Sequence, residues 1–275
     1  MFKILDKKQL NSVVASLTVE APFIAKKVKA GQFVIVRIDQ NGERIPLTVS
    51  DFDALEGTIK LVIQAIGYTT KRLSALNVGD FICDVVGPLG CPTDFKNAKK
   101  AIVIGGGVGC AIAYPQAKTL HNIGASVDII AGFRSKDIVI LEDEMKNVSD
   151  NLYITTDDGS YGEKGFVTDV LKRLMEKNSY DLVIAIGPVP MMKFVSLATK
   201  EYGIRTIVSL NPIMIDGTGM CGGCRVRVGN ETKFACVDGP DFDGHLVDFD
   251  ELMRRNGFYR EEESHICRME GVLNG

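Results

Sequence analysis

Apolar residues alternate with polar ones, or gather in short β-branched runs, over the first 97 residues of the chain. Four such segments stand out, at 13–20, 31–39, 57–67 and 79–90, each bounded by Gly, Pro, Asp or Asn. Strands spaced about ten residues apart in this way are typical of a β-sandwich or barrel. One helix is expected over 69–77, where threonines suit an N-cap. We therefore predict an antiparallel β-barrel domain over residues 1–97.

The pattern changes at Lys99, where longer apolar runs begin to alternate with helical stretches. Buried strands are expected at 99–109, where the run ends in glycines, and at 126–133, 151–158, 181–187 and 206–211. Helices are expected between them, at 110–124, 136–148, 165–178 and 190–203. Such alternation predicts a doubly wound parallel sheet, with 206–211 as its last strand. Residues 98–211 are thus predicted to form a Rossmann-like domain.

Three of the seven cysteines fall in a glycine-rich stretch directly after this sheet, DGTGMCGGCRVRVGNETKFAC. The spacing Asp-x4-Cys-x2-Cys-x11-Cys joins Asp216, Cys221, Cys224 and Cys236. With a cysteine in place of the aspartate, it would be the spacing that holds a 2Fe–2S cluster in plant-type ferredoxins, and a carboxylate can also bind iron. Glycines let so short a loop fold back and bring the ligands together. Residues 212–275 are therefore predicted to form a cluster-binding segment and a tail.

A structural zinc site is the competing interpretation of these cysteines, with Asp216 or His245 completing the ligand set. Zinc ribbons usually pair two Cys-x2-Cys knuckles, and this chain has one, so the iron–sulfur interpretation is favoured. After Cys236 the sequence is acidic and polar, which predicts turns and a short helix, on the outside or against a partner. Cys267 lies too far along to match the motif and is expected to be a free or interface thiol.

Composition narrows the function classes. The 275 residues are 45% hydrophobic and 24% charged, as expected for a folded protein of about two domains. The net charge of −3 comes without a cluster of lysines and arginines, so no nucleic-acid partner is expected. No apolar run approaches the roughly 18 residues of a membrane span, and the first residues lack a signal-peptide core. We expect no membrane association and a cytoplasmic location, where reduced thiols suit metal ligation.

Glycines 105, 106, 107 and 109 follow a predicted strand and open a predicted helix, as at a dinucleotide pyrophosphate site. The strict G-x-G-x-x-G/A fingerprint is missed, because Cys110 holds its last position, and Asp128 lies mid-strand rather than at the usual acidic ribose position. Arg134 and Lys136 are candidates for a 2′-phosphate contact, with solvated charges as the alternative. Asp157 is a candidate ribose contact at the sheet rim. These residues do not decide whether the dinucleotide is NAD or NADP.

A barrel, a glycine-rich nucleotide domain and a ferredoxin-spaced loop, in this order, resemble the ferredoxin–NADP reductase superfamily, and the resemblance covers nearly the whole chain. RIPLTVSD (44–51) resembles its flavin-binding strand, and IGYTTKRLS (66–74) resembles its FAD pyrophosphate loop and helix. GPLG (87–90) and GPVPMMK (187–193) resemble its other signature turns, and the DGP after Cys236 also matches. One departure is Ile45, where the family pattern has an arginine before the proline, so the role of Arg44 stays open.

The resemblance implies two sets of cofactor contacts. Those for FAD are Arg44, Pro46, Leu47, Thr48, Val62, Gln64, Gly67, Tyr68, Thr69, Thr70, Gly87, Pro88 and Gly90. Those for NAD(H) are Gly106, Gly107, Val108, Gly109, Gly187, Pro188 and Met191, beside which Arg134 and Asp157 are the candidates named above. No acid–base catalytic residue is expected, because the cofactors carry the chemistry.

Within the superfamily the chain resembles electron-transfer subunits. Those of dihydroorotate dehydrogenase have a cysteine where this chain has Asp216. The set of Asp and three Cys is similar to the small subunits of electron-bifurcating NADH-dependent ferredoxin:NADP oxidoreductases and of sulfide dehydrogenases. This resemblance implies FAD, a 2Fe–2S cluster, NAD(H), a larger flavin and iron–sulfur partner subunit, and ferredoxin as an indirect partner. A dihydroorotate dehydrogenase or sulfide dehydrogenase subunit is the closest alternative. A zinc-braced, non-redox nucleotide-binding module is the alternative from another class.

Overall fold

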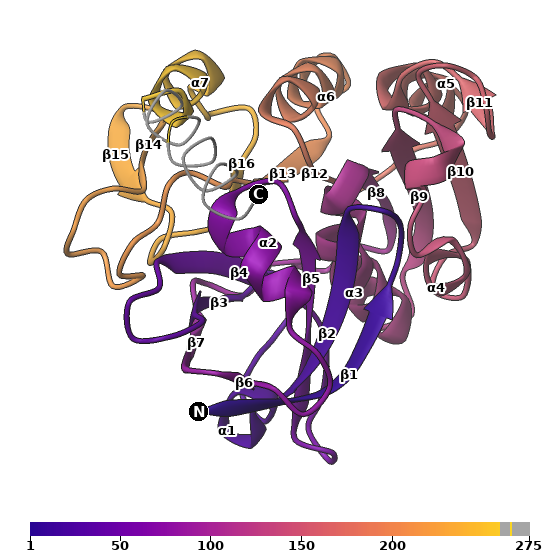
Figure 1. The fold of residues 1–275 in the computed structure, drawn as a ribbon. Helices are drawn as coiled ribbons and strands as arrows, with labels where there is room; N and C mark the ends of the chain where they lie inside the picture. The colour runs from indigo at the N-terminus through magenta and orange to yellow at the C-terminus, as the bar shows by residue number, and fades with distance from the viewer. Residues whose placement is uncertain (259–264, 266–275) are drawn as a thin grey trace.

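Two seven-stranded sheets dominate the structure, a computed structural model that describes residues 1–258 and residue 265 (Figure 1). The predictions for Cys267 and for the acidic residues 259–264 lie outside the described part of the chain. The first sheet has the order β6-β1-β2-β5-β4-β3-β7, and all its pairings are antiparallel. Its strands are β1 (Phe2–Gln9), β2 (Val14–Glu20), β3 (Phe33–Arg37), β4 (Arg44–Asp53), β5 (Thr58–Gln64), β6 (Phe81–Ile82) and β7 (Asp84–Leu89).

This sheet closes almost completely into the predicted barrel. Alternate residues of its strands point inward and form one buried cluster, which includes Leu17, Val34 and Leu61. Helix α2 (Tyr68–Ala75) packs Leu73 into the same cluster, and the short helix α1 (Pro22–Ala25) adds Ile24. Strand β1 was not predicted, because its sequence FKILDKKQ is mostly polar, and its pairing with β2 decides its conformation.

The second sheet has the order β11-β10-β9-β8-β12-β13-β16. Its strands are β8 (Lys100–Gly106), β9 (Ser126–Phe133), β10 (Asn151–Thr156), β11 (Glu163–Lys164), β12 (Leu182–Ile186), β13 (Arg205–Ser209) and β16 (Asp241–Asp243). All neighbours are parallel except β16, which runs antiparallel to β13. The doubly wound sheet is confirmed. Within the described residues, no helix has both the length and the hydrophobicity to cross a membrane.

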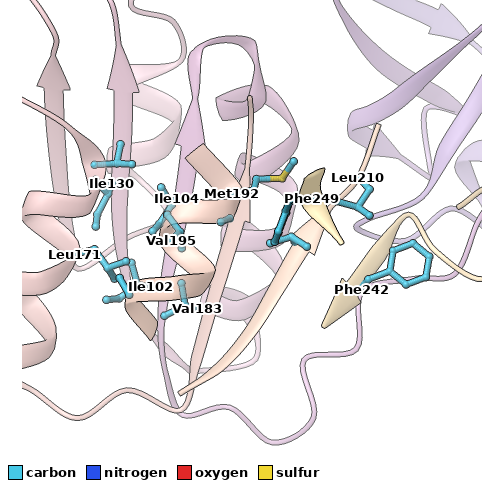
Figure 2. Close-up of a cluster of buried hydrophobic side chains, with 14 of the residues drawn as sticks. Ile102, Ile104, Ile130, Leu171, Val183, Met192, Val195, Leu210, Phe242 and Phe249 are labelled. Carbon is cyan, nitrogen blue, oxygen red and sulfur yellow. The ribbon is translucent and has the colours of Figure 1, made fainter. Parts of the chain in front are cut away.

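Helices cover both faces of this sheet. Helices α3 (Cys110–Asn122) and α4 (Glu142–Lys146) pack on one face and share a buried cluster with Val103 and Ile129. Helices α5 (Val167–Lys177) and α6 (Val189–Glu201) pack on the other face, where Leu171 and Val195 lie over the strands (Figure 2). A parallel sheet needs this burial on both sides, which explains the continuous apolar runs of its strands.

Two expectations for this domain were wrong. Residues 136–148 do not form one helix, because Val139 is extended and Leu141 has a φ of 57°, so only a 3-10 turn (Lys136–Ile138) and α4 remain. Segment 206–211 contributes β13, yet β13 is not the last strand, because β16 pairs with it from Ser209↔Asp241 to Ile207↔Asp243.

The C-terminal segment adds a hairpin of β14 (Arg225–Val228) and β15 (Glu231–Phe234), then β16, then helix α7 (Phe249–Asn256). Figure 1 shows β14, β15 and α7 beside α6 and above the barrel. The predicted short helix is α7, whose Phe249 and Leu252 join the buried cluster of the α5–α6 face. The segment is therefore packed into the nucleotide domain and does not fold around a core of its own.

Barrel, nucleotide domain and C-terminal segment meet at Asp241. Its Oδ2 accepts a hydrogen bond from Thr93 Oγ1 at 2.6 Å and lies 3.5 Å from Nε2 of Gln116 on α3. Gly31 leaves room for this contact, since a Cβ there would lie 2.2 Å from Thr93 Oγ1. Although Asp241 as a whole is partly exposed, its Oδ1 is fully buried, and neither Oδ1 nor Gln116 Oε1 has a partner among the described residues. Burial raises the pKa of Asp241 to about 6.

We predict that replacing Asp241 by Asn changes how stability depends on pH. The raised pKa means that the stabilising contribution of Asp241 is complete below its ordinary value of 3.8 and is lost as the pH rises through about 6. The loss is on the order of 3 kcal/mol. The melting temperature of the native chain should therefore fall between about pH 4 and pH 7 relative to that of Asp241→Asn, measured by scanning calorimetry. Parallel profiles for the two proteins would contradict a raised pKa.

Candidate functional sites

A nucleotide site is expected where the strand order of a doubly wound sheet reverses, which here is between β8 and β12. Two turns meet there. A Cβ on Gly106 would lie 2.6 Å from Met191 Sδ and 2.9 Å from Pro188 Cδ, and one on Gly109 would lie 2.4 Å from the Ile186 carbonyl oxygen. The structure thus brings together the predicted residues of the 106–109 and 187–191 turns, and glycines allow the close approach.

The open side of this site faces the start of α3. Gly107 has a φ of 57° and no atom within 4 Å of the position of a Cβ, so its backbone is accessible. The 3-10 turn Gly107–Gly109 leads directly into α3 and accepts the N–H of Cys110, so the N–H groups without helical partners are those of the turn itself. Backbone N–H groups at a helix start can bind a pyrophosphate.

The other predicted nucleotide contacts lie on the same edge of the sheet. Arg134 and Asp157 are exposed at the carboxyl ends of the neighbouring strands β9 and β10, where Asp157 N–H donates to the Phe133 carbonyl at 3.1 Å. Lys136 lies over the Tyr161 ring at 5.4 Å. Asp128 is buried in β9, where its carboxylate accepts hydrogen bonds from Tyr180 and Asn151, consistent with a structural role.

The predicted flavin strand is the outer face of β4. Arg44, Pro46 and Thr48 alternate with Ile45 and Leu47, and the latter two pack against the barrel core. Arg44 therefore lies on the same face as Pro46 and opposite to Ile45, which holds the position of the family arginine, so a contact of Arg44 with FAD stays a prediction. The side chain of Leu47 points into the barrel, so a flavin contact at this position would come from its backbone.

The other predicted flavin residues surround this strand. Val62 and Gln64 of β5 point away from the barrel core, opposite to Leu61 and Ile63. At the start of α2, the Oγ1 of Thr70 accepts hydrogen bonds from the N–H groups of Gly67 (3.0 Å) and Ile66 (3.2 Å).

The predicted GPLG turn is the end of β7 and the residue that follows it. A Cβ on Gly87, within β7, would lie 2.7 Å from Val34 Cγ1, and the Gly90 carbonyl accepts from Gln32 Nε2 at 2.8 Å. Its Pro88 is partly buried.

A cavity of about 670 Å³ adjoins the start of α2. Its lining consists of one loop and the first turns of the helix, namely Asp39, Gln40, Asn41, Gly42, Glu43, Tyr68 and Arg72. Glu43 accepts a hydrogen bond from Thr69 Oγ1, and Arg72 pairs with Asp39. Sequence reasoning found Tyr68 and Thr69 but missed the loop, because its contacts with α2 are long-range.

The predicted cluster ligands are arranged as two pairs. The Sγ atoms of Cys224 and Cys236 lie 3.2 Å apart. The carboxylate of Asp216 accepts hydrogen bonds from the N–H of Thr218 at 2.8 Å and of Cys221 at 2.9 Å, so Asp216 lies beside Cys221. These N–H groups, Thr218 first, lower the pKa of Asp216 and keep it ionised as a ligand must be.

This arrangement is compatible with two ligands on each of two irons. His245 lies elsewhere, with its Nε2 3.0 Å from Thr199 Oγ1, so it does not complete a zinc site. Burial raises the pKa of Cys236 to about 12, so its thiolate would form only by exchanging the proton for a metal ion.

The cluster loop lies against the barrel face that carries the flavin strand. A Cβ on Gly217 would lie 2.7 Å from Leu89 Cδ1 and 3.1 Å from Ile35 Cγ1, and Gly217 has a φ of 74°. Ile35 in turn is the direct cross-strand partner of Pro46. Ile35 also belongs to the same buried cluster as Cys224 and Cys236. The loop and the flavin strand are therefore neighbours on one surface.

Comparison with known proteins identifies a family for the C-terminal part of the chain and full-length relatives. Residues 211–248 match the family described as the iron–sulfur cluster binding domain of dihydroorotate dehydrogenase B. The chain is 47% identical over 261 residues to the dihydroorotate dehydrogenase B (NAD(+)) electron transfer subunit homolog of Thermotoga maritima, covering 95% of this chain and 92% of the relative. It is 36% identical to the electron transfer subunit of Fusobacterium nucleatum, covering 86% and 93%.

A solved structure is similar over nearly the full length. A chain from the NADH-dependent reduced ferredoxin–NADP oxidoreductase, described in connection with flavin-based electron bifurcation, superposes with a TM-score of 0.94 at 45% identity. The match covers 99% of this chain and 98% of that one.

We predict that Gly106→Ala weakens dinucleotide binding. The added methyl group would press on Met191 and Pro188 and displace the 187–191 turn from the site. We expect an affinity for NADH about tenfold lower, or about 1.4 kcal/mol, by calorimetric titration. Gly257→Ala is the control, because Gly257, like Gly106, has a negative φ (−90°), but the nearest atom to a Cβ there would be 3.4 Å away. Equal affinities for Gly106→Ala and the native chain would argue against this site.

Proposed function

Because the chain belongs to the family of dihydroorotate dehydrogenase B electron-transfer subunits and their homologues, we propose that it transfers electrons between NAD(H), FAD and a 2Fe–2S cluster. We further propose that it is the small subunit of an NADH-dependent ferredoxin:NADP oxidoreductase. The observation that carries the proposal is the contact of Gly217 with Ile35, which places the cluster loop next to the flavin strand.

The chain itself supplies orientation. When bound, the cofactors supply hydride transfer and one-electron transfer. The glycines of the 105–109 turn bind the dinucleotide pyrophosphate, and Met191 lies at the neighbouring turn, toward the nicotinamide. Arg44 and Pro46 hold the flavin against the outer face of β4, and the threonines of α2 bind near its pyrophosphate. Asp216 and the three cysteines hold the cluster in two pairs.

Two other functions fit less well. In a dihydroorotate dehydrogenase subunit a cysteine is expected in place of Asp216, so the ionised aspartate favours the ferredoxin:NADP oxidoreductase or sulfide dehydrogenase type. A zinc-braced nucleotide module fits less well because residues 211–248 match an iron–sulfur cluster binding domain.

We propose a heterodimer or larger assembly with a flavin and iron–sulfur subunit, through which electrons reach ferredoxin. Its reduced thiol ligands suit the cytoplasm.

An anaerobic absorption spectrum of the purified chain, before and after addition of NADH, tests the proposal. We expect flavin bands with an iron–sulfur shoulder, bleached by NADH and little by NADPH. Metal analysis should give two irons per chain, as a 2Fe–2S cluster requires. A colourless protein with stoichiometric zinc would reject the redox function and leave a nucleotide-binding fold.

Variants of Asp216 separate iron ligation from loop closure. Asp216→Cys supplies a soft thiolate in place of a hard carboxylate, so we expect a changed visible spectrum and a shifted cluster potential. Asp216→Asn keeps an oxygen that can accept the Thr218 N–H but removes the anionic ligand, so we expect cluster loss from an otherwise folded chain. If Asp216→Cys leaves spectrum and potential unchanged, Asp216 only closes the loop.

A further inference from the structure

Helix α7 places an arginine over the cluster loop, although it lies beyond the residues 211–248 that match the cluster-binding family. The carboxylate of Asp248 caps the helix by accepting from the Glu251 N–H at 2.9 Å, and Phe249 and Leu252 anchor its inner face. In the last turn, Arg255 Nη2 donates to the carbonyl oxygen of Gly223 at 3.2 Å. Gly223 directly precedes the ligand Cys224, so this guanidinium contacts the backbone between two ligands.

A second arginine approaches the same loop from β14. Arg225 directly follows Cys224, and its Nη1 lies 3.2 Å from the position of a Cβ on Gly222. The two arginines and Cys221 line one cavity of about 370 Å³. Two positive charges from separate elements thus converge on the turn that carries Cys221 and Cys224.

These charges lack carboxylate partners within the described residues. Neither Arg225 nor Arg255 takes part in any ion pair found there, in contrast to Arg37, Arg72 and Arg173. The Nε of Arg255 is buried and has no hydrogen-bond partner in the same part of the chain. A partly buried cation without a counter-ion is costly unless negative charge lies nearby. The ligand set of three thiolates and one carboxylate provides such charge.

We propose that Arg255, assisted by Arg225, raises the reduction potential of the cluster by stabilising its more negative, reduced state. Each electron accepted adds one negative charge to the site, and a fixed positive charge at the loop favours that state. The proposal rests on the electron-transfer function proposed above. It assigns a redox role to α7, whose sequence contains no cluster ligand.

The test is an EPR-monitored redox titration of the cluster in the complete complex with its partner subunit. Arg255→Gln removes the charge, whereas Arg255→Lys retains it without the forked geometry. Arg254→Gln is the matched control, because Arg254 is the neighbouring, exposed residue of the same helix and its loss changes the net charge equally. We expect Arg255→Gln to lower the reduction potential of the cluster. At a given solution potential the ratio of reduced to oxidised cluster should fall three- to tenfold, and tenfold corresponds to about 59 mV. Arg255→Lys should keep most of the native value, and Arg254→Gln nearly all of it.

Three results would overturn the proposal. One is an unchanged potential in Arg255→Gln with a normal cluster signal. Another is a shift of the cluster potential in Arg254→Gln as large as that in Arg255→Gln, which would mean that the net charge of the chain alone causes the shift. A third is a shift in Arg255→Lys as large as that in Arg255→Gln, which would mean that the contact with Gly223 matters and the positive charge does not. If Arg255→Gln loses the cluster, the potential of the cluster is measured in Arg225→Gln instead. An unchanged potential in that variant would reject the role of the arginine charges. A native complex without any cluster signal would instead reject the proposed function.

Discussion

The close packing of Gly217 on Ile35 and Leu89 is the contact on which the arrangement of the sites depends. A loop that holds a cluster must be near the flavin, yet the loop and the flavin strand belong to segments more than 150 residues apart. Glycine allows the loop backbone to touch the barrel surface, and Ile35, the β3 side chain that it touches, is the cross-strand partner of Pro46 in the predicted flavin strand. A larger side chain at Gly217 would push the loop away from the barrel face that carries the predicted flavin strand.

Asp241 restrains the same arrangement from the other side. It lies five residues after the ligand Cys236, and its carboxyl group touches Thr93 of the barrel connection and Gln116 of α3. A buried carboxyl group shared by three segments favours one mutual orientation, because a shift would also leave its Oδ2 unpaired in a low-dielectric site. The three cofactor regions are thereby held as one unit.

Much of the fold could be predicted from the sequence, because long elements repeat their apolar residues with a clear period. The barrel and the parallel sheet followed from such runs, and the ligand loop followed from cysteine spacing. Short elements were not predicted. An example is β16, the tripeptide Asp241–Asp243, whose conformation depends on pairing with β13. The helix expected over 136–148 was wrong because Leu141 takes a left-handed conformation there.

At the sites, local motifs were found and long-range contacts were missed. The face of the barrel on which Arg44 lies follows from the register of β4 with β3, and this register cannot be read from the sequence alone. Likewise, the contact between Arg255 and Gly223 joins positions 32 residues apart through the path of the chain around β16.

The strand β16 has a consequence for the stability of the nucleotide domain in this chain. It covers the edge of β13, which would otherwise present unpaired N–H and carbonyl groups. Removal of the cluster segment would leave this edge without a partner and would uncover the core residues that pack with Phe249 and Leu252 of α7. The segment therefore stabilises the sheet besides carrying the predicted ligands.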